Sequence, residues 1–143
     1  MARLVDDLLV IEGGAYDVFI YSRGLDRWDL EKTLTCPGQF LFSSVTLGAS
    51  RDYVVTGANE HPTGSFIGGV FVFERQDNWT QSTELSGIPA GGMDTFGSGI
   101  SISGDTILVG ASMMVNDVLC GPGKAFFFER TLAGWTQTAF FEN

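Results

Sequence analysis

The chain has 143 residues, of which 44% are hydrophobic and 13% aromatic, so it is long and apolar enough to fold as a domain with its own core. Its 17 acidic residues outnumber its 8 basic ones, which gives a formal net charge of −9 and argues against nucleic acids and anionic membranes as partners. No apolar run approaches the roughly 20 residues of a spanning helix, and the amino-terminus lacks the pattern of a signal peptide, so we expect no membrane insertion.

The predicted elements are short β-strands, because the apolar segments are brief, rich in Val, Phe, Ile and Thr, and without helical periodicity. The first group of strands falls at 4–11, 15–23 and 28–34. The second group falls at 42–47, 53–57, 68–75 and 79–85. The third group falls at 96–103, 106–110, 124–130 and 135–141. We expect each group to form one antiparallel sheet.

The three groups are copies of one repeating unit. Trp28, Trp79 and Trp135 are spaced by 51 and 56 residues, and each opens the last strand of its group. The segment Asp52–Ala58 (DYVVTGA) matches Asp105–Ala111 (DTILVGA), 53 residues later. A period of about 50 residues with four strands per copy predicts the blades of a β-propeller.

The sequence therefore predicts an all-β fold of four-stranded antiparallel propeller blades in a single segment, 1–143. Full blades are expected at 42–85 and 96–141, preceded by a partial blade at 4–34 that lacks its inner strand. About two full blades and one partial blade leave an incomplete ring, because propellers typically have about 4–8 blades. The second and third strands are apolar on both faces, as strands between two sheets require. An incomplete ring would leave two such faces exposed.

The unit resembles the FG-GAP repeats of β-propellers, which form the head of integrin α-subunits and occur in many bacterial and algal surface proteins. The resemblance lies in Phe96-Gly97, in the segments Val55–Ala58 and Leu108–Ala111 that end in Gly-Ala, and in the strand Gly69–Phe73. It implies a propeller fold, a role in protein binding or cell adhesion, and an extracellular or surface-associated location. We expect Gly97 and Gly99 to lie where inner strands crowd the propeller axis.

The chain departs from this family at several positions. Ser43 replaces the Gly of the Phe-Gly pair, and Asn59 and Ser112 replace the Pro that follows Gly-Ala. FG-GAP repeats often carry an Asp-x-Asp-x-Asp-Gly calcium loop, and calcium takes about 6–8 oxygen ligands. The corresponding turns hold one Asp each, Asp52 and Asp105, which we interpret as turn residues that bond their own backbone. We therefore expect no metal and no cofactor.

The long connections are expected on one face of the blades. They join the second strand to the third at 59–67 and 112–123, and one blade to the next at 35–41 and 86–95. Loops on a rigid scaffold are common binding sites, although these could equally be ordinary solvated loops. The candidate partner-binding residues are Asn59, Glu60, His61, Phe66, Met93, Asp94, Met113, Met114, Asn116 and Asp117.

No catalytic or metal-ligand pattern is found among the reactive side chains. His61 is the single histidine and has no second His, Cys or nucleophile motif near it. Cys36 and Cys120 fall about two blades apart, too far for an intrachain disulfide, which leaves free thiols or an intermolecular bridge. Asn78 opens an N-glycosylation sequon on a turn opposite the long loops, although so short a motif often arises by chance.

These observations predict a non-catalytic protein-binding or assembly module that presents its long loops, or an open blade face, to a partner protein or to another copy of itself. One alternative is a fragment of a larger secreted or surface adhesion propeller. Another is a carbohydrate-binding or glycan-active propeller, and glycoside chemistry would need two carboxylates about 5–10 Å apart in the axial funnel. The inner strands carry Ser, Gly and Thr instead, so we do not expect an enzyme.

Overall fold

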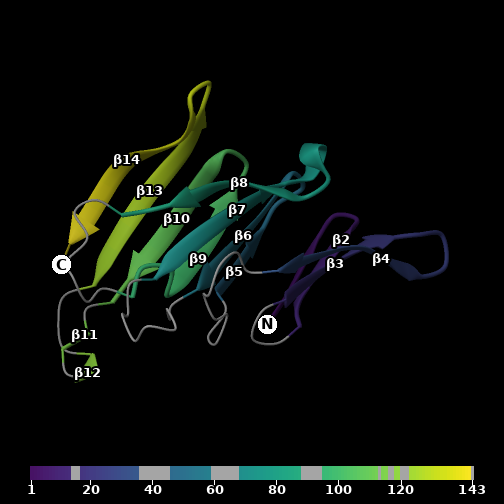
Figure 1. The fold of residues 1–143 in the computed structure, drawn as a ribbon, viewed down its shortest axis with the longest axis horizontal. Coiled ribbons are helices and arrows are strands. Elements are labelled where there is room, and N and C mark those ends of the chain that lie inside the picture. Colours follow the sequence, from purple (N-terminus) through teal and green to yellow (C-terminus); the bar gives the residue numbers. More distant parts are fainter. Residues whose placement is uncertain are drawn as a thin grey trace.

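The structure, a computed structural model, describes residues 1–13, 17–35, 46–58, 68–87, 95–112, 114–115, 118–119 and 123–142. Within these ranges three four-stranded antiparallel sheets make up almost the whole fold. We name them blade 1, blade 2 and blade 3 in chain order (Figure 1). No helix in the described part of the chain is long and apolar enough to cross a membrane.

Each blade is a meander in which consecutive strands pair as neighbours. Blade 1 contains β1 (Ala2–Val5), β2 (Leu8–Glu12), β3 (Asp17–Arg23) and β4 (Trp28–Thr35). Blade 2 contains β5 (Thr46–Ala49), β6 (Tyr53–Ala58), β7 (Gly69–Glu74) and β8 (Thr80–Leu85), with the 3₁₀ helix η1 (Arg75–Asp77) after β7. Blade 3 contains β9 (Gly99–Ser103), β10 (Thr106–Ala111), β13 (Lys124–Thr131) and β14 (Gly134–Glu142). Between β10 and β13, β11 (Met114–Val115) pairs with β12 (Val118–Leu119) in a small separate sheet.

Blade 1 is complete, which corrects the expectation of a partial blade at 4–34. The segment expected as one strand, 4–11, is divided by a turn at Asp6, whose φ of 52° lies in the left-handed region. Asp adopts this conformation more readily than most residues do, because its short side chain can bond the local backbone. Gly104, with a φ of 54°, takes the same place in the turn between β9 and β10. β1 is therefore the inner strand of blade 1.

Two other inner strands have bounds that differ from the expected ones. β5 covers 46–49, whereas 42–47 was expected, and residues 42–45 lie outside the described ranges. β9 begins at Gly99 instead of residue 96. Phe96 and Gly97 form a turn ahead of this strand, and Gly97 has a φ of 93° that only glycine adopts readily.

A β-bulge recurs between the third and fourth strands of every blade. The residue left without a partner lies three positions after the Trp of its blade: Glu31, Ser82 and Thr138. A bulge of this kind changes the direction in which the neighbouring side chains point. The repeat therefore extends to an irregularity of the backbone that the strand pattern did not predict.

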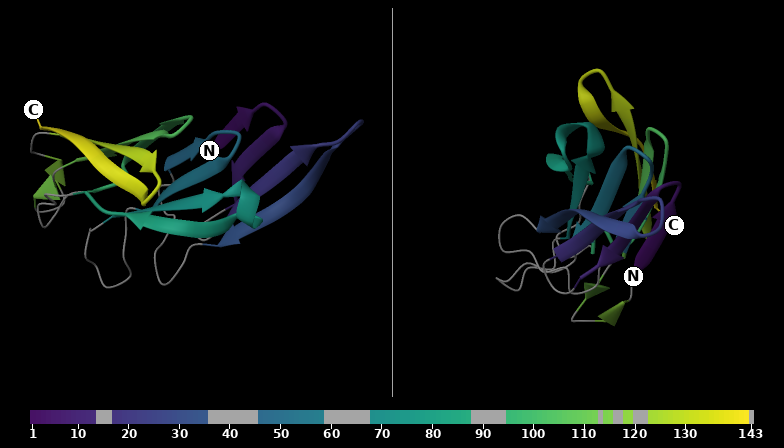
Figure 2. Two further views of the ribbon diagram at one scale, coloured as in Figure 1. Left: turned by 90° about the horizontal axis from the view of Figure 1, so that it is seen from above. Right: turned by 90° about the vertical axis from the view of Figure 1, so that its right-hand side faces the viewer.

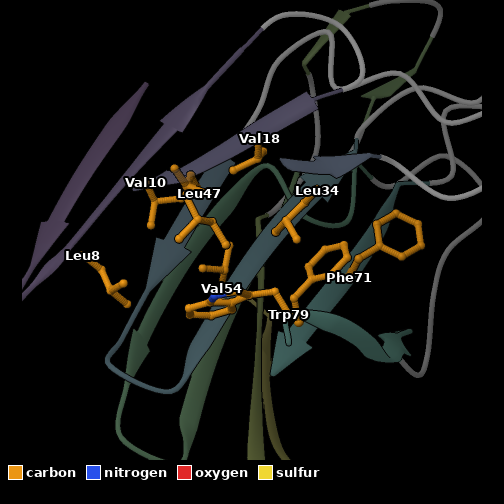
Figure 3. Close-up of a cluster of buried hydrophobic side chains, with 10 residues drawn as sticks. Leu8, Val10, Val18, Leu34, Leu47, Val54, Phe71 and Trp79 are labelled. Carbon is orange, nitrogen blue, oxygen red and sulfur yellow. The ribbon is translucent and has the colours of Figure 1, made fainter. Parts of the chain in front are cut away.

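The hydrophobic core lies between the blades. Val18 of blade 1 and Trp79 of blade 2 belong to one buried cluster, which fills the space between these two sheets (Figure 3). A second cluster, which includes Phe126, fills the space between blades 2 and 3. Because successive residues of a strand point to opposite faces, Val54 joins the first cluster and Val55 the second. Blade 2 is thus covered on both faces, and all six residues of β7 are buried.

The three blades stand side by side as an open row. Blade 1 (purple to blue) lies at one end and blade 3 (green to yellow) at the other, with blade 2 between them (Figure 1). The left view in Figure 2 shows the same order, and the described sheets do not close into a ring. Blades 1 and 3 each have one face turned away from blade 2.

Glycine allows the inner parts of blades 2 and 3 to approach closely. A Cβ atom added at Gly57 would lie 2.5 Å from the carbonyl oxygen of Gly97, and one added at Gly97 would lie 3.0 Å from Cγ2 of Val70. Gly97 therefore has the crowded position that we expected. The same expectation was wrong for Gly99, where an added Cβ atom would meet nothing within 4 Å, because this position belongs to the uncovered face of blade 3.

We expect Gly57→Ala to lower the free energy of unfolding by about 1–3 kcal/mol, because the new methyl group must displace backbone atoms. Gly123→Ala is the matched control, since the nearest atom to its added Cβ is 3.9 Å away, and it should change stability by less than about 0.5 kcal/mol. Urea denaturation followed by tryptophan fluorescence measures both. Equal stability of the two variants would contradict the close approach at Gly57.

Candidate functional site

The predicted partner-binding loops lie almost entirely outside the described residues. This applies to Asn59, Glu60, His61, Phe66, Met93, Asp94, Met113, Asn116 and Asp117, and to the two cysteines, Cys36 and Cys120. Met114 lies in β11, although its side chain is not described. The strand ends that anchor these loops share one end of each sheet, since Ala58 pairs with Gly69. The loop residues therefore stay a prediction.

Asn78 lies at the opposite end of blade 2, as expected. It follows η1 with a φ of 55°, its backbone N–H donates to the Arg75 carbonyl, and its side chain is exposed. Left-handed geometry is common for Asn at the end of a helical turn. The sequon thus lies on an exposed turn.

The turn aspartates have a structural role that recurs in every blade. The backbone carbonyls of Asp52 and Asp105 accept hydrogen bonds of 2.9 Å from the amides of Arg75 and Arg130, and Asp7 accepts one of 2.8 Å from Arg23. Each bond ties the turn after the first strand to the end of the third strand. Within the described ranges, no three His, Cys, Asp or Glu side chains come together as metal ligands would.

A polar contact joins blades 1 and 2 at this turn end. The Arg75 guanidinium lies 3.2 Å from the Asp7 carboxylate and 3.6 Å from the Glu31 carboxylate. The indole N–H of the buried Trp79 donates a 2.6 Å hydrogen bond to Glu31 Oε1. The hydrogen bond from Arg75 lowers the pKa of the Asp7 carboxyl, and the same bond raises the pKa of the Arg75 guanidinium. Blade 2 thus supplies an Arg and a Trp, and blade 1 supplies the acids.

The contact between blades 2 and 3 follows the same plan. Arg130 of blade 3 lies 3.3 Å from the buried carboxylate of Glu74 in blade 2. Trp135 packs edge-on against Tyr53 with ring centroids 5.2 Å apart, and the Tyr53 hydroxyl donates to Asp105 at 3.4 Å. Burial raises the pKa of the Tyr53 hydroxyl. We name the contact between two neighbouring blades a seam. In both seams, the Arg at the end of the third strand reaches an acid of the preceding blade.

The outward surface of blade 1, which we name the amino-terminal face, is apolar. Leu4, Leu9, Tyr21 and Leu30 form one row across its four strands, because each is the cross-strand partner of the next. Leu4 is 68% exposed. The residues that alternate with this row, such as Leu8, point into the core toward blade 2. The row is a sheet surface without a neighbouring sheet in the described part of the chain.

The outward surface of blade 3, which we name the carboxy-terminal face, is also apolar. It includes Leu108 and Phe127, which pair across strands, and Phe141, whose ring meets that of Phe127 edge-on at 5.6 Å. Phe141 is 60% exposed. Beside these rings lies a hollow of about 290 Å³, lined by Gly99, Ile100, Ser101, Leu108, Gly110 and Ala125. The small residues of the inner strands leave this space open.

We expect Glu31→Ala to lower the free energy of unfolding by about 1–3 kcal/mol, because the buried indole N–H of Trp79 would lose its acceptor. Glu31→Gln keeps an acceptor oxygen and should cost less than about 1 kcal/mol. Glu84→Ala, on the exposed side of β8, serves as a control that should be near neutral. The midpoint of urea unfolding ranks the stability of the three variants. An equal loss of stability in Glu31→Ala and Glu31→Gln would contradict the role of the hydrogen bond.

The Asp7–Arg75 pair should make stability depend on pH. Because the pKa of folded Asp7 is lowered from its ordinary 3.8, the pair stabilises the fold above that pH and loses its effect as the pH falls through the lowered value. Asp7→Asn should therefore lower the urea midpoint near pH 6 and match the wild type near pH 2. Asp26→Asn, on an exposed turn, is the charge-matched control. A constant difference between Asp7→Asn and wild type over this range would contradict the assignment.

Comparison with known protein families found a match to one stretch of this repeat. Residues 79–128, from the start of blade 2's last strand into β13, match the FG-GAP repeat family. A search of curated proteins found no match to the chain.

The motif residues of this match have structural positions. Phe96 is buried and meets the ring of Phe126 edge-on at 5.3 Å, and the Gly97 amide donates a 3.0 Å hydrogen bond to the Gly110 carbonyl. The Phe-Gly and Gly-Ala pairs of the repeat are thus bonded to each other, and Phe96 and Ala111 belong to the buried cluster between blades 2 and 3. The resemblance inferred from these residues is confirmed over residues 79–128, which match the FG-GAP repeat family.

Proposed function

We propose that the chain is a non-catalytic protein-binding or assembly module that works through its two open blade faces. The observation that carries this proposal is the exposure of Phe141. Its counterparts six residues after the Trp of blades 1 and 2 are Leu34 and Leu85, which are 2% and 4% exposed because the next blade covers them. Phe141 is 60% exposed on a surface of the same design.

The amino-terminal face supports the same proposal. Phe71 and Phe73 of blade 2 are buried against blade 1, whereas their counterparts Phe19 and Tyr21 on the amino-terminal face are only half-buried. Contiguous exposed apolar surface of this kind marks interaction sites in soluble proteins. A partner that covers these faces would remove apolar area from water, which stabilises a complex by about 25 cal/mol per Å² before association costs are subtracted.

The structure favours the blade faces over catalysis as the basis of function. The described inner strand β9 carries Gly, Ser and Ile, none of which supplies an acid, a base or a nucleophile activated by a neighbouring base. The long loops at 59–67 and 112–123 remain a proposed second contact.

A single substitution tests the role of the carboxy-terminal face. Phe141→Ser removes a large exposed ring and should weaken the native complex by about tenfold or more, because its burial is worth roughly 1.5–3 kcal/mol. Leu132→Ser is the control, since Leu132 is fully exposed on the turn between β13 and β14 and away from the face. The measurement is the mass of the affinity-tagged chain recovered from its native source by gentle extraction.

We expect wild type and Leu132→Ser to be recovered in complexes well above the 15.4 kDa of the chain, and Phe141→Ser to be depleted from them. A wild-type chain recovered as a folded 15.4 kDa monomer would contradict the proposal.

A further inference from the structure

We infer that the carboxy-terminal face of one copy receives the amino-terminal face of a second copy, so that two chains close head to tail into one propeller. This inference rests on the proposed function and names the partner. The amino-terminal face repeats the surface that blades 2 and 3 turn toward the preceding blade, and the carboxy-terminal face repeats the surface that blades 1 and 2 turn toward the following one. The two uncovered faces are therefore the two halves of one seam.

The first support is complementary shape: Leu4 projects from the amino-terminal face, and the carboxy-terminal face has a hollow. In the seam between blades 2 and 3, Ile100 and Ile102 of β9 rest against glycines of blade 2, and Cγ2 of Ile100 would lie 2.9 Å from a Cβ atom added at Gly48. By strand register, the counterparts of these two isoleucines in blade 1 are Ala2 and Leu4. Leu4 projects from the amino-terminal face and is 68% exposed.

The hollow on blade 3 corresponds to the surface around Gly48 and Gly57 of blade 2. Register places Ser101 and Gly110 of blade 3 where Gly48 and Gly57 stand in blade 2. These residues line the open volume of about 290 Å³ described above. Ala2 and Leu4 of a second copy would occupy that hollow in the way that Ile100 and Ile102 pack against the glycines of blade 2.

The second support is charge complementarity. Arg75 and Arg130 each reach an acid of the preceding blade, and their counterpart Arg23 ends β3 on the amino-terminal face. Arg23 is exposed and lies over the ring of Trp28, as Arg75 lies over Trp79. Its expected partner is Glu129, because Glu129 is the counterpart of Glu74 and is exposed on the carboxy-terminal face. The cation and the acid of the missing seam are thus both present, at opposite ends of one chain.

The third support is the blade count. The described residues of one chain form three four-stranded sheets, so two copies of this stretch form six. Six blades fall within the range of about 4–8 in which propellers close, whereas three chains would exceed it. Two copies of one seam related by a twofold axis form a closed assembly in which both faces are covered at once. Because blade 1 has its own inner strand, no strand must be donated from elsewhere.

Charge reversal tests this pairing. Arg23→Glu and Glu129→Arg each place like charges across both seams of the dimer, so each should raise the dissociation constant about tenfold per seam and about a hundredfold in all. Mixing the two variants restores an opposite-charge pair at each seam, with one pair reversed, and should recover dimer near the wild-type constant. Arg27→Glu is the control, since Arg27 pairs locally with Asp29 on an exposed turn.

Sedimentation velocity of the purified 143-residue chain at several concentrations gives the constants, and far-UV circular dichroism checks the fold. The inference predicts a wild-type dimer, weaker association of each single variant, and recovery on mixing. A wild-type chain that stays a folded monomer at all concentrations overturns it, as does a dimer indifferent to both reversals or unrestored by mixing. Open-ended oligomers in place of a dimer also overturn the closed ring.

A second variant blocks the hollow without disturbing the fold. Gly99→Leu has no atom within 4 Å of its new Cβ, so the monomer should fold normally, while the larger side chain fills the space that Leu4 of the second copy needs. We expect dimerisation, measured by sedimentation velocity, to be lost while the far-UV circular dichroism stays that of the wild type. Unchanged dimerisation of Gly99→Leu would overturn the inference.

The outcome also separates this inference from the proposed function. A purified chain that is monomeric, but that is found in a complex with a different protein when taken from its native source, overturns the self-association and leaves the binding module intact. A chain that is monomeric in both settings overturns both.

Discussion

The fold depends on apolar contact between neighbouring sheets. A single four-stranded sheet has no interior, so its side chains are buried only where another sheet covers them. Val54 and Val55 show this most simply, because they are adjacent in sequence and belong to different buried clusters. Blade 2 is the one described sheet with neighbours on both sides, and it is the most completely buried. The two end blades have the same alternation of side chains, but one face of each is not covered by another described sheet.

The polar contacts at the turn ends set the order in which sheets can stack. Apolar packing alone tolerates sliding and alternative neighbours, whereas an Arg that must meet an acid of the preceding blade fixes both direction and register. Partly exposed ion pairs contribute little net stability, so we attribute to them a role in the specificity of sheet pairing. The Trp79–Glu31 hydrogen bond adds to this, since a buried indole N–H without an acceptor is costly. The contact between blades 2 and 3 differs in one respect: Ser82 of blade 2 is the counterpart of Glu31, and Trp135 Nε1 has no hydrogen-bond partner among the described residues.

Most of the architecture could be predicted from sequence, because the strands recur with Trp and Gly-Ala anchors at a period of about 50 residues. The inner strand of blade 1 was missed because Leu4 to Ile11 reads as one apolar segment interrupted by two acids. The Asp6-Asp7 pair aligns with Gly104-Asp105 of the third repeat, and this alignment was the signal in the sequence for a turn. The polar seams could not be predicted, because Asp7, Glu31 and Arg75 are far apart in sequence and meet only once two sheets have packed. Open faces could be expected from the small number of blades. Their complementarity could not, because only the strand registers show which residues of the two faces correspond.

The central claim is that the two end faces are inter-blade surfaces that the native assembly covers. Hydroxyl-radical footprinting of the assembled protein, read by mass spectrometry, measures the exposure of each side chain directly. The account predicts that Leu4 and Phe141 are protected, while Leu25 and Leu132, exposed on turns, are oxidised rapidly. Oxidation of Phe141 as fast as that of an unfolded reference peptide, in a chain whose Trp79 stays protected, would contradict it.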